Sequence, residues 1–263
     1  MATWVCADIH GYYDIYEQIN SFIAPGDEVY FLGDAIDRGP DSYKTMKAIR
    51  ENPYWHYYRG NHEEMLINAL EEHLEEMETD EFPDGTTNWS YWKCLENGAM
   101  YKNKPSAWRI IVEQGEVAVR NWIDYLKNQT ILYSIDACKN GCIIHLSHAG
   151  TSTPGIIKLT DDVEKDLIWD RSHIYENVDK RYSKNISIHG HTPCNYLQDM
   201  IDGKSFGQCK NNEPIFYQKN KLCIDGGVYH TGKVHLINLD TLTFNNIEYH
   251  TFETKEDLYG KGE

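Results

Sequence analysis

Five short polar clusters, spread over most of the chain, constrain this sequence more than any other feature. Each holds carboxylate, carboxamide or imidazole groups, which suit hard or borderline divalent metals. Each also follows or closes a run with strand character, so the polar side chains would leave a sheet at the ends of its strands. The clusters lie at residues 8–10 (Asp-Ile-His), 33–39 (Gly-Asp-Ala-Ile-Asp-Arg-Gly), 60–63 (Gly-Asn-His-Glu), 147–150 (Ser-His-Ala-Gly) and 189–193 (His-Gly-His-Thr-Pro).

Strands and helices alternate over the first sixty residues. We expect strands at 3–7, 28–32 and 54–59, separated by helices at 15–23 and 41–50. This β-α-β-α-β succession predicts a parallel sheet, and ligands of such sheets bind beyond the carboxyl ends of the strands. The first three clusters all follow a predicted strand, so they are expected at that edge.

The middle of the chain has a helical pattern. An apolar stripe with helical spacing runs from Met65 to Met77, and ten acidic residues with no Lys or Arg lie between Glu63 and Asp84. We expect a break at 82–85, a resumed helix at 89–96 and one long amphipathic helix at 106–127. The prediction is a single domain over 1–263, with a helical cap inserted at 64–129.

The last part of the chain is rich in predicted strands. Runs at 131–135, 142–146 and 185–188 precede later ones at 215–218, 222–224, 234–238 and 247–251, and the later runs are expected to form a second sheet. Cys138 and Cys142 have C-x3-C spacing with no matching second pair, so a turn is favoured over a structural zinc site.

Composition excludes several classes of protein. A chain of 263 residues that is 41% hydrophobic can bury one substantial core. Its net charge of −16 disfavours nucleic acid as a partner, and no apolar run is long enough to cross a bilayer. The start of the chain lacks the features of a secretory signal, and the seven cysteines are scattered, which favours a reducing cytoplasm. The oligomeric state stays open.

The order and composition of the clusters resemble the metal-dependent phosphoprotein phosphatase family, especially its bacterial and phage members. The resemblance extends from Asp8 to the segment 222–227 (Leu-Cys-Ile-Asp-Gly-Gly), with only faint traces between residues 64 and 135. It implies an α/β protein with a calcineurin-like four-layer α/β/β/α sandwich. It also implies two divalent metal ions at one edge and the hydrolysis of phosphate esters.

Metal ligands can be assigned in two steps. Side chains alternate along a strand, so Asp8 and His10 point to the same side and can share one ion, while the carboxylate of Asp34 can bridge two ions. The resemblance implies that Asp8, His10 and Asp34 hold the first metal, and Asp34, Asn61, His148 and His191 the second. These oxygen and nitrogen ligands suit Mn, which we expect, with Fe or Zn as alternatives. The competing interpretation is that Asp34 and Asn61 merely cap helices.

The resemblance also implies catalytic roles. A metal-bridging hydroxide would attack the phosphorus in line, and His62, oriented by Asp37, would protonate the leaving group. The alternative for His62 is a third metal ligand. Arg38 and Arg171 would bind the phosphate oxygens, although Arg171 could instead form a surface ion pair with Asp170 or Glu164. Two further histidines, His145 and His189, are expected to be structural.

The function that this implies is hydrolysis of phosphate monoesters, above all of phosphoserine and phosphothreonine in proteins, or of another small phosphoester. The alternative is a symmetrical bis(5'-nucleosyl)-tetraphosphate hydrolase, whose motifs are very similar. A third interpretation is a non-catalytic phosphoprotein-binding protein, but every matched catalytic position holds a competent residue. An acidic helix near the metals would repel a tetraphosphate and attract a basic phosphopeptide, unless its acids face only bulk water.

Overall fold

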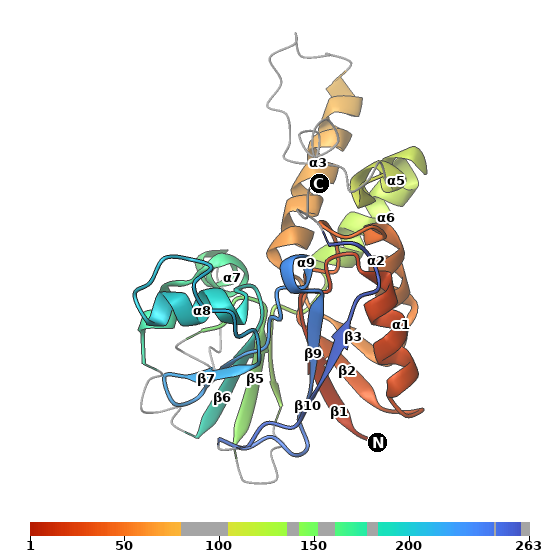
Figure 1. Ribbon diagram of the computed structural model, residues 1–263. Helices are drawn as coiled ribbons and strands as arrows, with labels where there is room; N and C mark the ends of the chain where they lie inside the picture. Colours follow the sequence, from red (N-terminus) through yellow and green to blue (C-terminus); the bar gives the residue numbers. More distant parts are fainter. Residues whose placement is uncertain (80–104, 136–141, 152–160, 178–183, 245, 259–263) are drawn as a thin grey trace.

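The fold is an α/β sandwich of two sheets covered by helices on both outer faces (Figure 1). The structure is a computed structural model that describes residues 1–79, 105–135, 142–151, 161–177, 184–244 and 246–258. The predicted break at 82–85, the helix at 89–96 and the turn after Cys138 lie outside the described residues. The four-layer arrangement expected from the resemblance is confirmed.

The first sheet has the strand order β10-β9-β1-β2-β3. Its strands are β1 (Thr3–Cys6), β2 (Glu28–Phe31), β3 (Trp55–Tyr57), β9 (Lys233–Asn238) and β10 (Tyr249–Glu253). β1, β2 and β3 run parallel, as the alternating pattern predicts, whereas β9 is antiparallel to β1 and β10 to β9.

The second sheet has the order β4-β5-β6-β8-β7. Its strands are β4 (Leu132–Ile135), β5 (Ile143–Ser147), β6 (Asn185–His189), β7 (Ile215–Tyr217) and β8 (Lys221–Cys223). The expectation that runs 234–238 and 247–251 belong to this sheet was wrong. β9 pairs instead with β1. Both faces of β9 are apolar, so one face can pack into each of the two hydrophobic cores.

Two hydrophobic cores lie on either side of the first sheet. Along β1, Trp4 and Cys6 pack toward the helices, while Val5 packs into the space between the sheets. β9 divides in the same way, with Leu236 on the helix side and Ile237 between the sheets. Because side chains alternate between the two faces of a strand, successive residues of β1 and β9 enter different cores, and both strands are buried on both faces.

Helices complete the outer layers. α1 (Tyr13–Phe22), α2 (Ser42–Glu51), α3 (Asn61–Thr79), α5 (Ala107–Glu113) and α6 (Glu116–Lys127) lie on the side of the first sheet. α7 (Asp161–Trp169), a 3-10 turn η2 (Ser172–Tyr175) and α8 (Cys194–Ile201) lie on the side of the second sheet, and α9 (Val228–Thr231) lies near the edge between the sheets.

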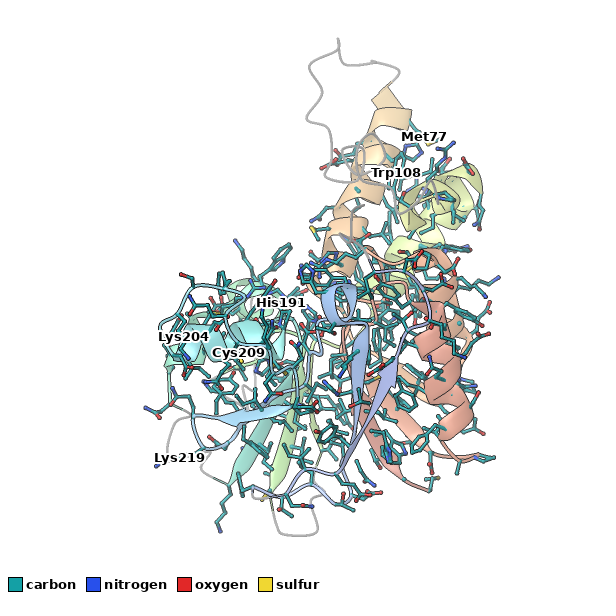
Figure 2. All side chains as sticks on the ribbon, viewed as in Figure 1. Met77, Trp108, His191, Lys204, Cys209 and Lys219 are labelled. Atoms are coloured by element: carbon teal, nitrogen blue, oxygen red, sulfur yellow. The ribbon has the colours of Figure 1, made fainter. Side chains whose placement is uncertain are left out.

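Most of the described residues in the region predicted as a helical cap lie in α3, α5 and α6. Leu70 of α3, Trp108 of α5 and Trp122 of α6 join the core on the helix side of the first sheet. The expected single helix at 106–127 is two helices, because Gly115 has a φ of +90° and interrupts the helical backbone between them. In Figure 2, Met77 and Trp108 mark this region above His191. Within the described ranges, no helix combines the length and apolar character that a bilayer crossing requires.

Candidate metal centre

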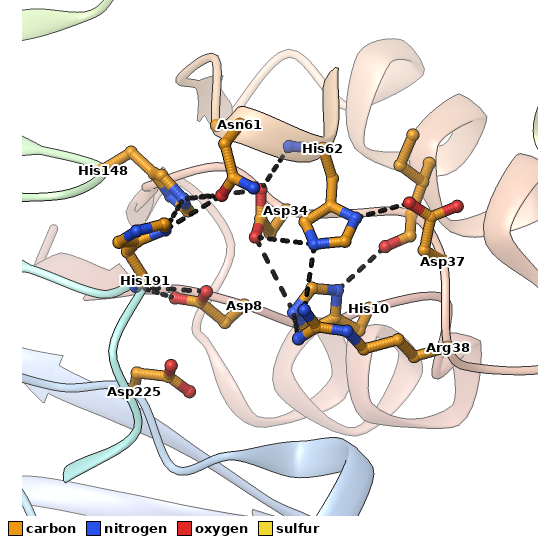
Figure 3. A network of polar contacts seen from close by, with 12 residues as sticks. Asp8, His10, Asp34, Asp37, Arg38, Asn61, His62, His148, His191 and Asp225 are labelled. Atoms are coloured by element: carbon orange, nitrogen blue, oxygen red, sulfur yellow. Dashed lines mark hydrogen bonds and ion pairs between the residues drawn. The ribbon is translucent and has the colours of Figure 1, made fainter. Parts of the chain in front are cut away.

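The five polar clusters meet at the carboxyl ends of parallel strands (Figure 3). The side chains that leave these ends are Asp8 and His10 after β1, Asp34 after β2, Asn61 and His62 after β3, His148 after β5 and His191 after β6. In Figure 3, Asp34 lies between two groups of ligand-forming side chains. One group contains His10, Asp34 and His62, and the other contains Asp34, His148 and His191, with the ligand atoms of each group within 4.8 Å of one another.

The backbone is strained at these residues. Among the described non-glycine residues, those with a left-handed φ include Asp8, His10, Asp34, Asp37, Arg38 and His191, with values between 47° and 69°. Each such residue costs on the order of 1–3 kcal/mol, and such strain concentrates at functional sites. A residue that merely caps a helix needs no such backbone, so the strain favours a binding role for Asp34 over the capping alternative.

Backbone carbonyl groups fix which nitrogen of three imidazoles carries the proton. Nδ1 of His10 donates to the Ile36 carbonyl (2.9 Å), and Nδ1 of His148 donates to the Leu32 carbonyl (2.8 Å). Nε2 of His191 donates to the Trp169 carbonyl (3.1 Å). In each neutral ring the other nitrogen then presents a lone pair to the site, as a metal ligand must.

Three electron-pair donors therefore face one another beside Asp34, two from imidazoles of the second group and one from the neighbouring Asn61. Asn61 Oδ1 lies 2.9 Å from His148 Nε2 and 2.9 Å from His191 Nδ1, and the two nitrogens are 3.1 Å apart. With metal–ligand bonds of about 2.1 Å, neighbouring ligand atoms of one ion lie about 3 Å apart. Lone pairs at these distances repel one another unless a cation lies among them, so the residues fit a divalent metal.

The first group differs from the expected ligand set. Nε2 of His10 lies 3.7 Å from Asp34 Oδ2, and Nε2 of His62 lies 3.8 Å from the same oxygen. Asp8 is close but not among the three converging side chains, because its carboxylate accepts hydrogen bonds from the backbone N–H of His191 (3.1 and 3.0 Å). The assignment of Asp8 to the first metal stays a prediction, and the alternative of His62 as a ligand stays open.

Burial sets the charge of these groups. It raises the pKa of the Asp8 carboxyl well above its ordinary value, and the neighbouring Asp225 and Asp34 carboxyls raise it further. Burial lowers the pKa of His148 to about 4, so its imidazole is neutral at pH 7. Buried carboxylates favour protons unless a cation replaces them, so metal binding at this site is expected to release protons and to weaken as the pH falls.

Glu63 is a positioning residue that the sequence analysis missed. Its buried carboxylate accepts hydrogen bonds from the backbone N–H groups of Asp34, Ala35 and Gly60 (2.8 Å each) and from the Tyr57 hydroxyl (2.9 Å). It thereby joins the Asp34 loop to the start of α3. The available signal was its place three residues after Gly60, where a helix-capping glutamate binds the backbone at the helix start.

Two glycines of the polar clusters lie so close to carboxylate oxygens of the site that there is no space for a side chain. A Cβ atom at Gly60 would overlap Oδ1 of Asp34, and one at Gly190 would overlap Oδ2 of Asp8. Any larger residue at either position would displace a carboxylate of the site. These contacts explain why the polar residues of both clusters are accompanied by glycine.

His62 and Asp37 form a close pair. His62 Nδ1 lies 2.5 Å from Asp37 Oδ2, and both side chains are buried. Burial lowers the pKa of His62 to about 4, and Arg38 lowers it further, whereas Asp34 raises it. A phosphate dianion beside His62 would favour the protonated imidazole, because an opposite charge stabilises the charged form. The pair is thus arranged for proton transfer to or from Nε2.

The two arginines come from different elements, Arg38 from the loop after β2 and Arg171 from the short link between α7 and η2. Arg38 donates from its guanidinium to Nε2 of His10 (2.8 Å) and of His62 (3.1 Å). Arg171 donates from Nε to Thr192 Oγ1 (3.0 Å). The alternative ion pair of Arg171 with Glu164 is not formed in the described part of the chain, because Glu164 pairs with Arg59, and Asp170 accepts hydrogen bonds from Ser172.

A fully buried lysine holds the segment that carries Arg171. The ammonium group of Lys221 donates to the backbone carbonyl of His173 within the turn η2 and to that of Glu176, the residue that follows it. The second of these distances is 2.7 Å. Lys221 therefore ties the segment that follows Arg171 to β8. This contact holds the backbone from which the Arg171 side chain extends.

We expect Lys221→Met and Arg171→Ala to affect the same step. If Arg171 binds phosphate as the resemblance implies, Arg171→Ala should lower kcat/KM for phosphoester hydrolysis roughly 10²-fold, because a donor to growing charge would be lost. Lys221→Met should lower it roughly 10-fold through misplacement of Arg171. Steady-state kinetics of both variants and of the double variant provide the measurement, with Lys204→Met, an exposed lysine, as the control. If the double variant loses the product of the two single effects, Lys221 does not act through Arg171.

Asp225 is a further buried carboxylate beside the site (Figure 3). Burial raises its pKa to about 7, while the nearby Arg38 and Arg171 lower it. It accepts a hydrogen bond from the backbone N–H of Gly227 (2.7 Å). The sequence analysis gave Asp225 no role, since the resemblance there concerned only the surrounding motif.

The two histidines expected to be structural have core partners. His189 is buried and contacts the Tyr217 hydroxyl (2.7 Å) and the Gly190 carbonyl (3.0 Å). His145 contacts Ser134 Oγ (2.8 Å) and the side chain of Asn185 (2.9 Å). Neither belongs to the groups of converging ligand atoms.

A family model and several known proteins match this chain. The model described as calcineurin-like phosphoesterase matches residues 1–195. Serine/threonine-protein phosphatase 2 of Escherichia coli (strain K12) is 38% identical over 72 residues, which is 26% of this chain and 32% of that protein. Serine/threonine-protein phosphatase 1 of Salmonella typhimurium is 38% identical over 69 residues, 25% of this chain and 32% of that protein. The match thus spans about a third of these curated relatives.

Solved structures share the fold at low sequence identity. A protein serine/threonine phosphatase from Saccharomyces cerevisiae with similarity to human phosphatase PP5 has a TM-score of 0.53 at 14% identity, covering 98% of this chain and 81% of that chain. A metallophosphoesterase from Sphaerobacter thermophilus has a TM-score of 0.51 at 14% identity, with 97% and 90% covered. A candidate diadenosine tetraphosphatase has a TM-score of 0.50 at 14% identity, with 95% and 92% covered.

Proposed function

The chain belongs to the calcineurin-like phosphoesterase family, and from this membership we propose that it is a protein phosphatase acting on phosphoserine and phosphothreonine. The observation that supports this most is the trio of facing acceptor atoms on Asn61, His148 and His191 beside Asp34. Such a trio suits a divalent ion, and the neighbouring His10 and Asp34, with Asp8 nearby, would hold a second. We propose Mn for both.

Different residues would have different roles in the reaction. Two bound ions would lower the pKa of a water for in-line attack and offset the negative charge of the phosphate. Arg38 and Arg171 would bind phosphate oxygens and stabilise the charge that grows as the ester bond breaks. His62, with Nδ1 held by Asp37, would donate the proton of Nε2 to the leaving oxygen. No serine or cysteine nucleophile is required.

The charge of the chain supports a protein substrate. Glu72 and Glu75 are exposed on α3, the helix that begins at Asn61 and His62. The first acid of this acidic run, Glu63, points inward, so the negative surface begins farther from the metals than the sequence suggested. A net charge of −16 would disfavour nucleic acid and polyphosphate and attract a basic phosphopeptide. The relatives named as serine/threonine phosphatases support the same substrate class.

A cytoplasmic location is part of the proposal. Cys6, Cys142, Cys194, Cys209 and Cys223 are free thiols, which suits a reducing compartment. The proposed partners are therefore phosphorylated proteins of that compartment, with neither nucleic acid nor a membrane as a partner.

We expect a phosphoserine peptide flanked by Lys and Arg to be hydrolysed with a higher kcat/KM than diadenosine tetraphosphate at low salt. The advantage should shrink as salt screens the acidic surface. Direct competition between the two substrates at several salt concentrations measures this. A higher kcat/KM for the dinucleotide would replace the proposal with a symmetrical dinucleoside tetraphosphate hydrolase.

A further inference from the structure

A row of aromatic rings begins at the proposed phosphate-binding arginine. The guanidinium carbon of Arg38 lies 4.2 Å from the centre of the Tyr229 ring. Tyr229 contacts His230, with ring centres 3.9 Å apart, and His230 faces Tyr196 at 6.1 Å. Tyr196 in turn packs against Phe206 at 5.6 Å. These four rings, Tyr229, His230, Tyr196 and Phe206, are called the ring row below.

The ring row reaches from the site to the protein surface. Tyr229 is half-buried beside Arg38 and His10, whereas Phe206 at the far end is 68% exposed. A phenylalanine that is this exposed does not contribute to the hydrophobic core, although Phe206 contacts another ring. The row comes from two places in the chain, α9 and the segment from α8 to Phe206, both of which follow site motifs. In Figure 2, Lys204 and Cys209 mark the segment that carries Phe206.

The contact between Arg38 and Tyr229 indicates which part of a ligand would bind to the ring row. If the phosphate of a substrate is bound by Arg38, the groups next to the phosphate must pass close to Tyr229. A peptide advances about 3.3–3.6 Å per residue, so a side chain roughly two to four residues from a phosphoserine could reach the outer rings. The occupant is then part of the substrate itself.

The ring row fits a peptide side chain better than a nucleotide. The planes of successive rings in the row are inclined to each other by 46°, 58° and 42°. The row therefore presents both ring faces and ring edges to an aromatic side chain that packs at an angle. A polyphosphate chain would need cations along the same path. Lys204, which lies two residues before Phe206, is already paired with Asp202 (2.7 Å).

We propose that the ring row is a specificity subsite that binds an aromatic side chain of a phosphopeptide, close in sequence to the phosphorylated residue. This inference rests on the proposed phosphatase function and adds the substrate feature that the enzyme selects. The contact between aromatic rings stabilises such pairs enough to change kcat/KM roughly 3-fold to 10-fold. Selection would therefore act on the choice among phosphoproteins.

The test uses phosphoserine peptides in which one Phe is moved through the four positions on each side of the phosphoserine, with an all-Ala peptide as reference. Wild-type protein should prefer Phe over Ala roughly 3-fold to 10-fold in kcat/KM at one or two of these positions. Phe206→Ala and Tyr196→Ala should each reduce that ratio to less than about twofold. Phe22→Ala is the matched control, because Phe22 is also exposed (43%) but packs beside Trp4 and His250.

Three results would overturn the inference. One is hydrolysis of all peptides at equal rates by the wild-type protein, and another is an unchanged preference in Phe206→Ala. The third is a selective loss of diadenosine tetraphosphate hydrolysis in Phe206→Ala, which would make the row a base-binding site. Failure of the proposed function is distinct, since the wild-type protein would then hydrolyse no phosphoserine peptide, the all-Ala reference included.

Discussion

Asp34→Asn is expected to remove nearly all phosphoesterase activity and at least one metal ion from the protein. Among the residues that the structure describes, Asp34 is the one side chain shared by the two groups of converging ligand atoms. Its Oδ2 faces His10 and His62, and its Oδ1 lies 3.5 Å from His148 Nε2. An amide has one oxygen and no charge, so it cannot bridge two cations as a carboxylate does. Several kcal/mol of transition-state stabilisation would be lost, or roughly 10³-fold in kcat/KM.

Metal analysis of the purified variant, together with its kinetics, measures this effect. Asp124→Asn provides the control, because Asp124 is exposed on α6. Asn61→Asp tests the other group, since it keeps an oxygen between His148 and His191 and should retain metal. An Asp34→Asn protein that keeps two ions per chain would show that Asp34 does not bridge them.

His62→Gln is expected to lower turnover most for substrates whose leaving group needs a proton. If Nε2 of His62 donates to the leaving oxygen, turnover of a phosphoserine peptide should fall roughly 10²–10⁴-fold. The loss should be smaller for p-nitrophenyl phosphate, because its phenolate leaves without a proton. A general acid acts only while protonated, so wild-type activity on phosphoserine should fall as the pH rises through the pKa of His62 in the complex, and this limb should vanish in the variant.

The same variant separates the two roles left open for His62. Metal content should stay at the wild-type value if His62 is an acid, whereas loss of one ion would make it a ligand alongside His10 and Asp34. Asp37→Asn should reduce turnover and should add little to His62→Gln, because Asp37 acts through the imidazole at 2.5 Å. His56→Gln is the control, because His56 is half-exposed on β3 and pairs with Glu28.

The sequence predicts where the proposed metal ligands lie, because each of them follows a predicted strand. Runs of apolar and aromatic residues predict β1, β2 and β3, and parallel pairing then brings Asp8, Asp34 and Asn61 to one edge without further information. The resemblance added the order of the ligands. The structure brings together every residue assigned to the metals, with Asp8 displaced toward the backbone of His191.

Other features depend on contacts that no local pattern encodes. An apolar strand can pair with any sheet that has a free edge, so β9 and β10 could not be assigned to the first sheet from their composition. Glu63 looked like the first acid of an exposed run, but four donors around its carboxylate turn it inward. The role of Lys221 was likewise not predictable, because its carbonyl partners lie 48 and 45 residues earlier in the chain.

We propose above all that two metal ions, held by residues at the carboxyl ends of strands from both sheets, are required for phosphate ester hydrolysis. The most direct test measures metal content and p-nitrophenyl phosphate turnover on the same samples, before chelation, after exhaustive chelation and after reloading with Mn²⁺. We expect two ions per chain in the active samples, no turnover without metal, full recovery with Mn²⁺ and a circular dichroism spectrum that changes little throughout. Metal-free protein that hydrolyses the ester as fast as the loaded form would contradict the account.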